Sequence, residues 1–261
     1  MNVKDVENYL NNELMLQEQE KWDNSGLQIG NYNQSVSGIL LTLDITEECV
    51  DKCIESNCNL IISHHPLIFT SLKNIDVSTC NGRIIQKLLK YDISAYSMHT
   101  SLDLALNGVN ESLADALGLK RTSNLIDINK NCANKIGYGG IAKIESINII
   151  EYAEIVKEKL MCKNVELYCN NVEKKISTIA FCGGSGANFI QNAILNNADV
   201  YITGDIKYHD AQFALNNNLA IIDAGHYNTE RVVLDKLYEI LFKKIKNIQV
   251  YDKNFVNKVI L

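Results

Sequence analysis

Two of the five histidines in this chain end strand-like apolar runs and are followed by an acid four residues later. The pairs are His99 with Asp103 and His226 with Glu230. A doublet, His64-His65, ends a third apolar run of the same kind. Imidazole and carboxylate groups are the usual nitrogen and oxygen ligands of a divalent transition metal. The pattern therefore predicts a metal-binding protein.

The histidine doublet further predicts that two metal ions lie close together. Pro66 follows it directly and favours an extended conformation at His65. Successive side chains of extended backbone point to opposite sides, so adjacent imidazoles chelate one ion poorly but can each reach a different ion. A carboxylate can bridge two such ions, and either Asp103 or Glu230 could do so. Alternatively, both acids only favour a helix N-terminus.

The elements that position these residues occur as two copies of one pattern. The first copy has expected helices at 3–16, 45–56, 82–91 and 109–118 and expected strands at 26–30, 37–44, 59–66 and 93–99. The second has expected helices at 148–160, 187–197, 208–217 and 229–245 and expected strands at 164–169, 176–184, 199–205 and 219–226. Further expected strands are 137–144 and one or two in the tail from residue 247.

This alternation predicts an α/β fold: a tandem duplication of an α/β unit with mixed, largely parallel sheets and helices on both faces. The first repeat is expected to span residues 1–125 and the second 126–261, with the metal site between them. The polar segment Lys120–Lys135 is the best candidate boundary. Reactive residues of such sheets gather at the carboxyl ends of the strands. The residues expected there are His64, His65, His99, Asp205 and His226.

Three other features admit both a functional and a structural interpretation. Asp44 could orient a ligating histidine or cap the next helix. The glycine turn at 183–186 could present backbone N–H groups to an anion, although a tight strand-to-helix turn is the commoner use of such a sequence. His209 could move protons or contact substrate, or it could be a helix-surface residue.

Composition restricts the class of protein. With 261 residues, of which 46% are hydrophobic, the chain is long enough to bury a large core. The net charge is −6 and no run of Lys or Arg exceeds two residues, which argues against a nucleic-acid partner. The eight cysteines are expected to be reduced, small buried side chains. No stretch approaches the ~18 apolar residues of a membrane span, so we expect a soluble, cytoplasmic protein without a membrane partner.

Six motifs, in order along nearly the whole chain, resemble one family. They are WDNSGLQIG at 22–30, SHHPLIF at 63–69, HTSLD at 99–103, GGSG at 183–186, TGDIKYHDAQFA from 203 and DAGHYNTE at 223–230. Together they are similar to the GTP cyclohydrolase 1 type 2 homologues, also called Nif-three-like proteins, which are dinuclear-metal hexamers. The short segment 120–135 leaves no room for the domain that longer members insert between the halves, so the chain resembles the minimal form.

The resemblance implies a ligand set and an assembly. The implied metal ligands are His64, His65, Asp103, His226 and Glu230, with Glu230 bridging both ions. His99 matches a histidine beside the site that is a candidate for proton transfer or substrate contact. The implied assembly is a homohexamer. Gly140 and Ala142 depart from the family pattern, which has Arg and Gly there, so a role of that Arg is not expected in this chain.

Two functions are compatible with such a site. The first is a metal-dependent hydrolase acting on a nucleotide or similar small polar substrate, GTP cyclohydrolase-like by resemblance, with His99 or His209 moving protons. The second is a non-catalytic metal-binding, metal-delivery or regulatory hexamer. The cofactor is expected to be two divalent metal ions per chain. Zinc is the first choice, and iron, manganese and nickel suit the same donors.

Overall fold

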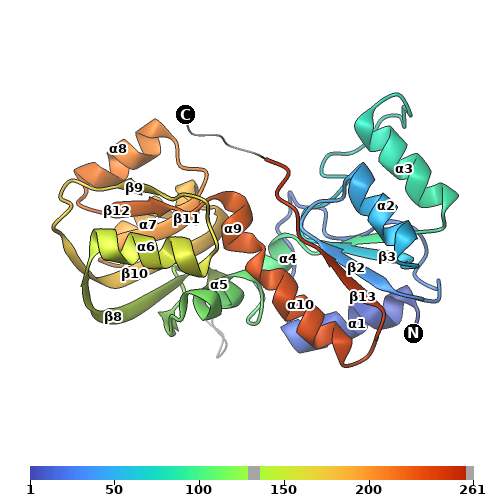
Figure 1. Cartoon of the computed structure of the whole chain (residues 1–261), viewed down its shortest axis with the longest axis horizontal. Helices are drawn as coiled ribbons and strands as arrows, with labels where there is room; N and C mark the ends of the chain where they lie inside the picture. Colours follow the sequence, from blue (N-terminus) through green and yellow to red (C-terminus); the bar gives the residue numbers. More distant parts are fainter. Residues whose placement is uncertain (129–135, 257–261) are drawn as a thin grey trace. The chain divides into compact units, whose positions relative to one another are not determined.

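The computed structural model describes residues 1–128 and 136–256. It divides into two compact units, which are treated separately below (Figure 1). The first unit is Met1–Ala105 together with Leu234–Leu261, and the second unit is Leu106–Val233. The first unit is discontinuous in sequence because a C-terminal strand pairs with its sheet.

The first unit is built on a five-stranded sheet in the order β1-β4-β3-β2-β13. Strands β2, β3, β4 and β13 are parallel, and β1 is antiparallel to β4. The strands are β1 (Gly26–Ile29), β2 (Ile39–Thr42), β3 (Leu60–Ser63), β4 (Ser94–Ser97) and β13 (Ile248–Tyr251). The helices are α1 (Val3–Leu14), α2 (Glu47–Glu55), α3 (Cys80–Lys90), α4 (Thr100–Asp103) and α10 (Val232–Phe242).

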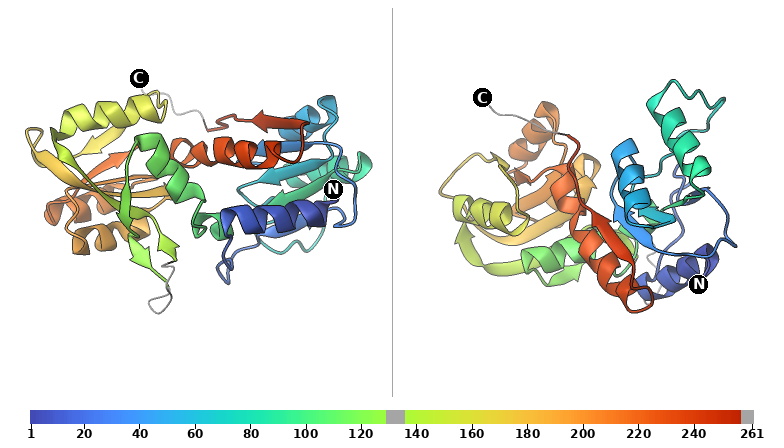
Figure 2. Two further views of the ribbon diagram at one scale, coloured as in Figure 1. Left: turned by 90° about the horizontal axis from the view of Figure 1, so that it is seen from below. Right: turned by 45° about the vertical axis from the view of Figure 1, so that its right-hand side comes forward.

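Helices cover both faces of this sheet, with α2 and α3 on one face and α1 and α10 on the other (Figures 1 and 2). Alternate residues of a strand point to opposite faces, so Leu40 and Ile61 pack with α2 and α3. Local sequence sets the helix starts. The side chain of Thr46 caps α2 by accepting from the Cys49 N–H, and that of Thr79 caps α3 by accepting from the Gly82 N–H.

The second unit contains a six-stranded sheet in the order β5-β8-β10-β11-β12-β9 and a two-stranded ribbon, β6-β7. Its strands are β5 (Arg121–Ser123), β6 (Ile126–Asp127), β7 (Gly137–Tyr138), β8 (Gly140–Asn148), β9 (Glu166–Tyr168), β10 (Lys175–Ser185), β11 (Val200–Gly204) and β12 (Ala220–Asp223). Its helical segments are α5 (Val109–Leu117), α6 (Ile149–Lys159), the 3-10 turn η1 (Ala187–Phe189), α7 (Ile190–Leu195), α8 (Tyr208–Asn216) and α9 (His226–Glu230).

Alternation along β10 divides the core of the second unit into two layers. Ile179 and Phe181 pack with α5 and α6 on one face of the sheet. Ala180 and Cys182 pack with α7 and α8 on the other face. The second unit is therefore a three-layer α/β/α arrangement, as the apolar strand runs predict.

Both units contain the same core topology. In each, a helix leads into a strand that pairs antiparallel with the last of three consecutive parallel strands. These elements are α1, β1, β2, β3 and β4 in the first unit and α6, β9, β10, β11 and β12 in the second. The predicted duplication of an α/β unit with mixed sheets is confirmed. The sheet of the first unit is largely parallel, but in the six-stranded sheet only the β10-β11 and β11-β12 pairs are parallel. The boundary predicted for the repeats, after residue 125, remains a prediction, because the compact units are delimited by packing.

Four expected elements differ from the structure. The strand expected at 137–144 is two strands, β7 and β8, which belong to different sheets. The helix expected at 229–245 is two helices, α9 and α10, which meet at Arg231. The helix expected at 187–197 begins with the 3-10 turn η1 before α7. The segment Lys120–Lys135, read as a polar linker, contains β5 and β6 in its described part because β5 pairs with β8 and β6 with β7; residues 129–135 lie outside the described residues.

Most cysteines are buried side chains, as expected, including Cys49, Cys53 and Cys58. Burial raises the pKa of the Cys49 thiol to about 12, so this group is a neutral thiol near pH 7. Cys80 is an exception, because it begins α3 on the exposed side. Among the described residues, no helix is long and apolar enough to cross a lipid bilayer.

Two buried tyrosines of the second unit allow the stabilising effect of a buried hydroxyl hydrogen bond to be measured. The Tyr201 hydroxyl donates to the buried Gly186 carbonyl at 2.9 Å, whereas the Tyr152 hydroxyl has no hydrogen-bond partner among the described residues. Tyr201→Phe should lower the free energy of unfolding by about 0.5–1.5 kcal/mol, because it removes one buried hydrogen bond, while the Gly186 carbonyl keeps the bond from the Phe189 N–H. Tyr152→Phe should be neutral or slightly stabilising. Urea denaturation of both variants measures the difference, and equal losses would contradict this account.

Candidate metal centre

Three parallel strands of the first unit end at the same level. Thr42 of β2 is in register with Ser63 of β3, and Ser63 is in register with Ser97 of β4. Residues that follow parallel strands emerge at one edge of the sheet. The doublet His64-His65 and His99 therefore reach the same edge, as the sequence predicts.

Hydroxyl groups at the strand ends shape the turns that carry the histidines. The Ser63 hydroxyl donates to the His65 carbonyl at 2.8 Å, and the Thr42 hydroxyl donates to the Asp44 carbonyl at 3.0 Å. The Ser63 and Ser97 hydroxyl oxygens also lie 2.8 Å apart. A side-chain hydroxyl that bonds two residues ahead fixes a local turn, so these buried groups aim the segments after β2 and β3.

Each histidine of the doublet is anchored through its Nδ1 atom. His64 Nδ1 lies 2.8 Å from the Met98 carbonyl, and His65 Nδ1 lies 2.8 Å from Asp44 Oδ1. Such a bond orients the ring and presents Nε2 for metal ligation. The two interpretations of Asp44 are thereby resolved: it orients His65, and Thr46 is the residue that caps α2.

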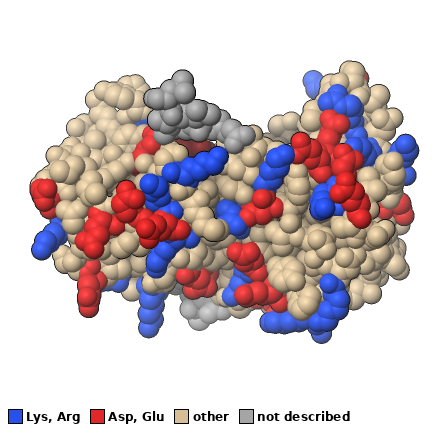
Figure 3. All heavy atoms as spheres, in the orientation of Figure 1, with Lys and Arg blue, Asp and Glu red and all other residues tan. Residues whose placement is uncertain are grey.

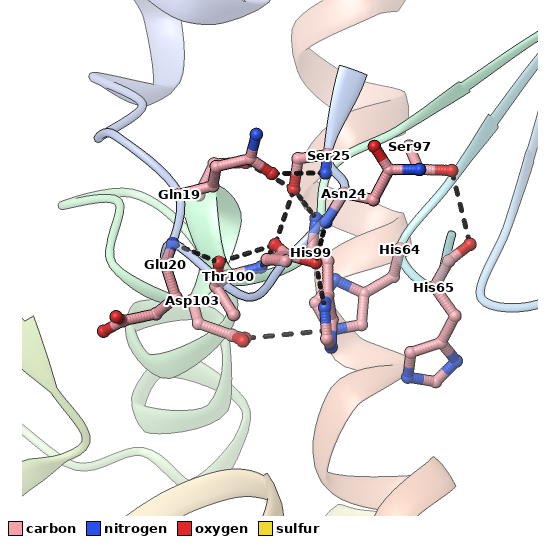
Figure 4. Close-up of polar contacts among 12 residues, drawn as sticks. Gln19, Glu20, Asn24, Ser25, His64, His65, Ser97, His99, Thr100 and Asp103 are labelled. Carbon is pink, nitrogen blue, oxygen red and sulfur yellow. Dashed lines mark hydrogen bonds and ion pairs between the residues drawn. The ribbon is translucent and has the colours of Figure 1, made fainter. Parts of the chain in front are cut away.

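The structure brings the histidines of the first unit into one group. One ligand atom from each of His64, His65 and His99 lies within 4.8 Å of the others. Asp103 Oδ1 is 3.7 Å from His64 Nε2 (Figure 4). Four predicted site residues thus meet within this unit. His99 belongs to the same group of ligand atoms as His64 and His65.

Asp23 is a part of this site that the sequence does not reveal. Its side chain is fully buried and accepts from His99 Nδ1 at 2.8 Å. It also accepts from the Thr100 N–H at 3.0 Å and hydroxyl at 2.6 Å, and from the Ser25 hydroxyl at 2.9 Å. Burial alone raises the pKa of Asp23, but the bonds from Thr100 and His99 outweigh it and hold the pKa at about 2.

His99 is oriented by Asp23 and is mostly buried among the other rings. Burial lowers its pKa first, and the neighbouring His64 lowers it further, whereas Asp23 acts in the opposite direction. The net direction is downward, which favours the neutral imidazole near pH 7. A neutral ring with Nδ1 bound to a carboxylate can accept a proton, or coordinate a metal, through Nε2.

The second unit supplies its own histidine and carboxylate pair. His226 Nδ1 lies 2.7 Å from Asp205 Oδ2, and His226 Nε2 lies 3.1 Å from Glu230 Oε2. His226 and Glu230 are the first and last residues of α9, so their spacing of four places both on one helix face. Glu230 is 4% exposed. This carboxylate and imidazole form the second set of metal donors.

The glycine turn makes room for this carboxylate. A Cβ atom at Gly184 would lie 2.1 Å from Glu230 Oε1, and Gly184 has a φ of +68°. The Gly183 N–H donates to Asn110 and the Gly184 N–H to the Thr229 hydroxyl. These two N–H groups bond to protein atoms and are not available to an anion, and the turn packs closely around Glu230. Anion binding by the rest of the turn stays a prediction.

The remaining candidates lie apart from these donor groups. His209 is exposed near the start of α8, with Gln212 3.5 Å from its Nδ1 and the Tyr208 ring beside it. It belongs to none of the metal-donor groups found among the described residues, and those groups contain no cysteine. Gly140 and Ala142 are buried on β8, and a Cβ atom at Gly140 would lie 2.3 Å from the Phe181 ring.

The whole described chain matches one family. The model of Duf34/NIF3 (NGG1p interacting factor 3) matches residues 1–257. This chain belongs to the Duf34/NIF3 family. A relative from Clostridium acetobutylicum, named GTP cyclohydrolase 1 type 2 homolog, is 36% identical over 231 residues, which cover 88% of this chain and 85% of the relative.

Other Duf34/NIF3 proteins agree in fold and differ in length. A crystal structure of a Bacillus cereus protein related to NIF3 has a TM-score of 0.88 and 26% identity, and the match covers 100% of this chain and 99% of that one. The alignment with a Staphylococcus epidermidis GTP cyclohydrolase 1 type 2 homolog spans 344 positions and covers 93% of this chain. Since this chain has 261 residues, that relative contains inserted sequence, and this chain is a short form of the family.

The ionised form of Asp23 should stabilise the first unit in a pH-dependent way. Its folded pKa of about 2 lies below the ordinary 3.8, so its contribution is present above pH 3.8 and is lost as the pH falls towards 2. Asp23→Asn should lower the free energy of unfolding by about 1–3 kcal/mol near neutral pH, because one amide oxygen cannot accept all the hydrogen bonds that the carboxylate accepts.

Denaturant unfolding at several pH values measures this effect. The difference between wild type and Asp23→Asn should be constant from about pH 5 to 7 and shrink below about pH 4. Asp76→Asn is the control, since Asp76 is exposed and bonds to neighbouring residues of its own loop. A difference that grew with acidification would refute the assignment.

Proposed function

We propose that this protein binds two divalent metal ions per chain through His64, His65, Asp103, His226 and Glu230, with Glu230 bridging the ions. The observation that carries this proposal is the convergence of the His64, His65 and His99 ligand atoms within 4.8 Å. The His226–Glu230 pair of the second unit supports it. Joining the two donor sets in one dinuclear centre follows from the family resemblance.

The residues present fit such ions chemically. The hydrogen bonds at Nδ1 of His64, His65 and His226 leave Nε2 as the coordinating atom in each ring. Buried carboxylates such as Glu230 are stabilised by nearby positive charge, which a divalent cation supplies. Three imidazoles and two carboxylates suit zinc first, and also iron, manganese or nickel.

We propose further that the protein is a metal-dependent hydrolase acting on a nucleotide or similar small polar substrate. When bound, paired divalent ions lower the pKa of water and stabilise developing negative charge. The chain's own contribution is proton transfer by His99, whose ring Asp23 holds beside the donor group. His209 lies outside the donor groups, so we assign it at most a substrate contact.

A non-catalytic metal-binding, metal-delivery or regulatory protein is the alternative. The same ligands would serve it. The Asp23–His99 arrangement supports the hydrolase if His99 is not itself a ligand, because a storage site has no need of an oriented proton acceptor. A homohexamer is part of the proposal in either case. Positive and negative side chains are intermixed on the face shown in Figure 3, which fits a small substrate better than a polyanion.

Metal content is the first test of the proposal. Protein prepared without chelator and loaded with zinc or manganese should contain about two ions per chain, as two-metal sites do. Glu230→Ala should lose both ions, because a bridging ligand serves both, whereas Asp103→Ala should lose chiefly one. Elemental analysis and calorimetric titration measure these values.

His209→Gln is the matched control for metal content, since His209 is an exposed histidine outside the donor groups. It should retain two ions per chain. His99→Gln should also retain them if His99 transfers protons, and should lose one if His99 is a ligand. A wild-type content of one ion or less after loading would reject the dinuclear centre.

Turnover is the second test. Metal-loaded protein should hydrolyse at least one member of a panel of nucleotides and phosphoesters. His65→Ala and His226→Ala should abolish this, and His99→Gln should lower kcat by about 100- to 10,000-fold at unchanged metal content, as expected for a general acid or base. Absence of turnover across the panel, with two ions bound, would favour the non-catalytic alternative.

A further inference from the structure

Two exposed aromatic side chains lie beside His99, and the function proposed above gives neither a role. Trp22 is 60% exposed and Phe69 is 50% exposed, and their ring centroids are 6.1 Å apart. Large aromatic side chains gathered at one exposed place usually mark a binding surface, because each one leaves apolar area in water.

The rings of Trp22, Phe69 and His99 are inclined to one another, and we call this group the aromatic corner. The Trp22 and His99 ring centroids are 6.0 Å apart at an interplanar angle of 78°, and those of Phe69 and His99 are 6.1 Å apart at 75°. The Trp22 and Phe69 planes are inclined at 56°. Rings inclined in this way do not cover one another face to face, so an aromatic face remains on which a further planar ring can stack.

The segments that carry these rings are held together before any ligand binds. The Asn24 amide donates to the Ile68 carbonyl at 2.5 Å, and the Ile68 N–H donates to the Gln28 side-chain oxygen at 3.2 Å. Asp23, next to Trp22, is bound to His99 and Thr100. Exposed side chains on a fixed backbone lose little freedom when they bind a ligand, which favours affinity.

Within the aromatic corner, the His99 ring separates Trp22 and Phe69 from the metal donors His64 and His65 of the first unit. The His99 ring centroid is 5.3 Å from that of His64 and 5.8 Å from that of His65. A ligand stacked on the corner therefore has its substituents next to the donor group. This separation matches a molecule in which a planar ring is joined to a polar or anionic group.

We propose that Trp22 and Phe69 bind the planar heteroaromatic ring of the substrate, such as a nucleobase, while its polar end lies at the metal donors. This inference rests on the proposed function, because the donor group must hold metal to attract that end. Stacking of a base on an aromatic side chain changes affinity about 5- to 100-fold. Trp22 and Phe69 would thus set the substrate class without touching the reacting atoms.

Trp22 is the only tryptophan of the chain, so its fluorescence reports on the corner directly. Metal-loaded full-length protein is titrated with guanosine 5′-monophosphate and with ribose 5-phosphate, which lacks the base. The nucleotide should quench the fluorescence and bind about tenfold more tightly. Ribose 5-phosphate should bind without quenching.

Variants separate stacking from folding and from metal binding. Phe69→Ala and Trp22→Ala should each weaken nucleotide binding about tenfold in calorimetry, with metal content and ribose 5-phosphate affinity unchanged. Trp22→Phe and Phe69→Tyr should restore most of the affinity. Tyr91→Ala is the control, because Tyr91 is 47% exposed in the same unit and outside the ring contacts with histidine; it should match wild type.

The outcomes distinguish this inference from the proposed function. If two ions bind but both ligands bind equally and Phe69→Ala has no effect, the aromatic corner is rejected and the metal centre stands. If no metal binds, the proposed metal-dependent function and the inference about the aromatic corner are both rejected. If light scattering shows that Trp22→Ala or Phe69→Ala dissociates the assembly, the corner is a contact between copies of the chain and the inference is overturned.

Discussion

Parallel strands that end at one level force the residues after them to one edge of the sheet, and the candidate metal centre depends on this constraint. In the first unit the ends of β2, β3 and β4 are in register at Thr42, Ser63 and Ser97. In the second, Thr203 of β11 is in register with Asp223 of β12. A slip of one residue would turn the following side chains to the opposite side. The hydrogen-bond register of the strands therefore determines where the metal-donor side chains lie.

The same anchoring scheme occurs in both units. An acid that follows one parallel strand bonds to Nδ1 of a histidine that follows the next strand: Asp44 holds His65, and Asp205 holds His226. Sequence duplication alone does not explain this likeness, because the paired strands occupy different places in the two topologies. The shared feature is physical. One pair of adjacent parallel strands in each unit brings a carboxylate and an imidazole within hydrogen-bond reach.

Local patterns predict much of this molecule and miss what long-range packing decides. The α/β alternation, the duplication and the convergence of His64, His65 and His99 follow from apolar runs that end in histidine. Asp23 could not be assigned, because it meets His99 across 76 residues of sequence. The break between α9 and α10 was also missed, since the pattern from 229 to 245 is continuously helical and gives no sign of a break at Arg231.

Each donor set combines a buried group with a partly exposed one, and this has a thermodynamic consequence. His64 is 1% exposed and Glu230 is 4% exposed, whereas His65 and His226 are partly exposed. Burying a carboxylate costs free energy that nearby positive charge offsets. A metal ion that binds the native state alone stabilises it by mass action. Metal binding should therefore be linked to the stability of both units, because each contributes a buried donor.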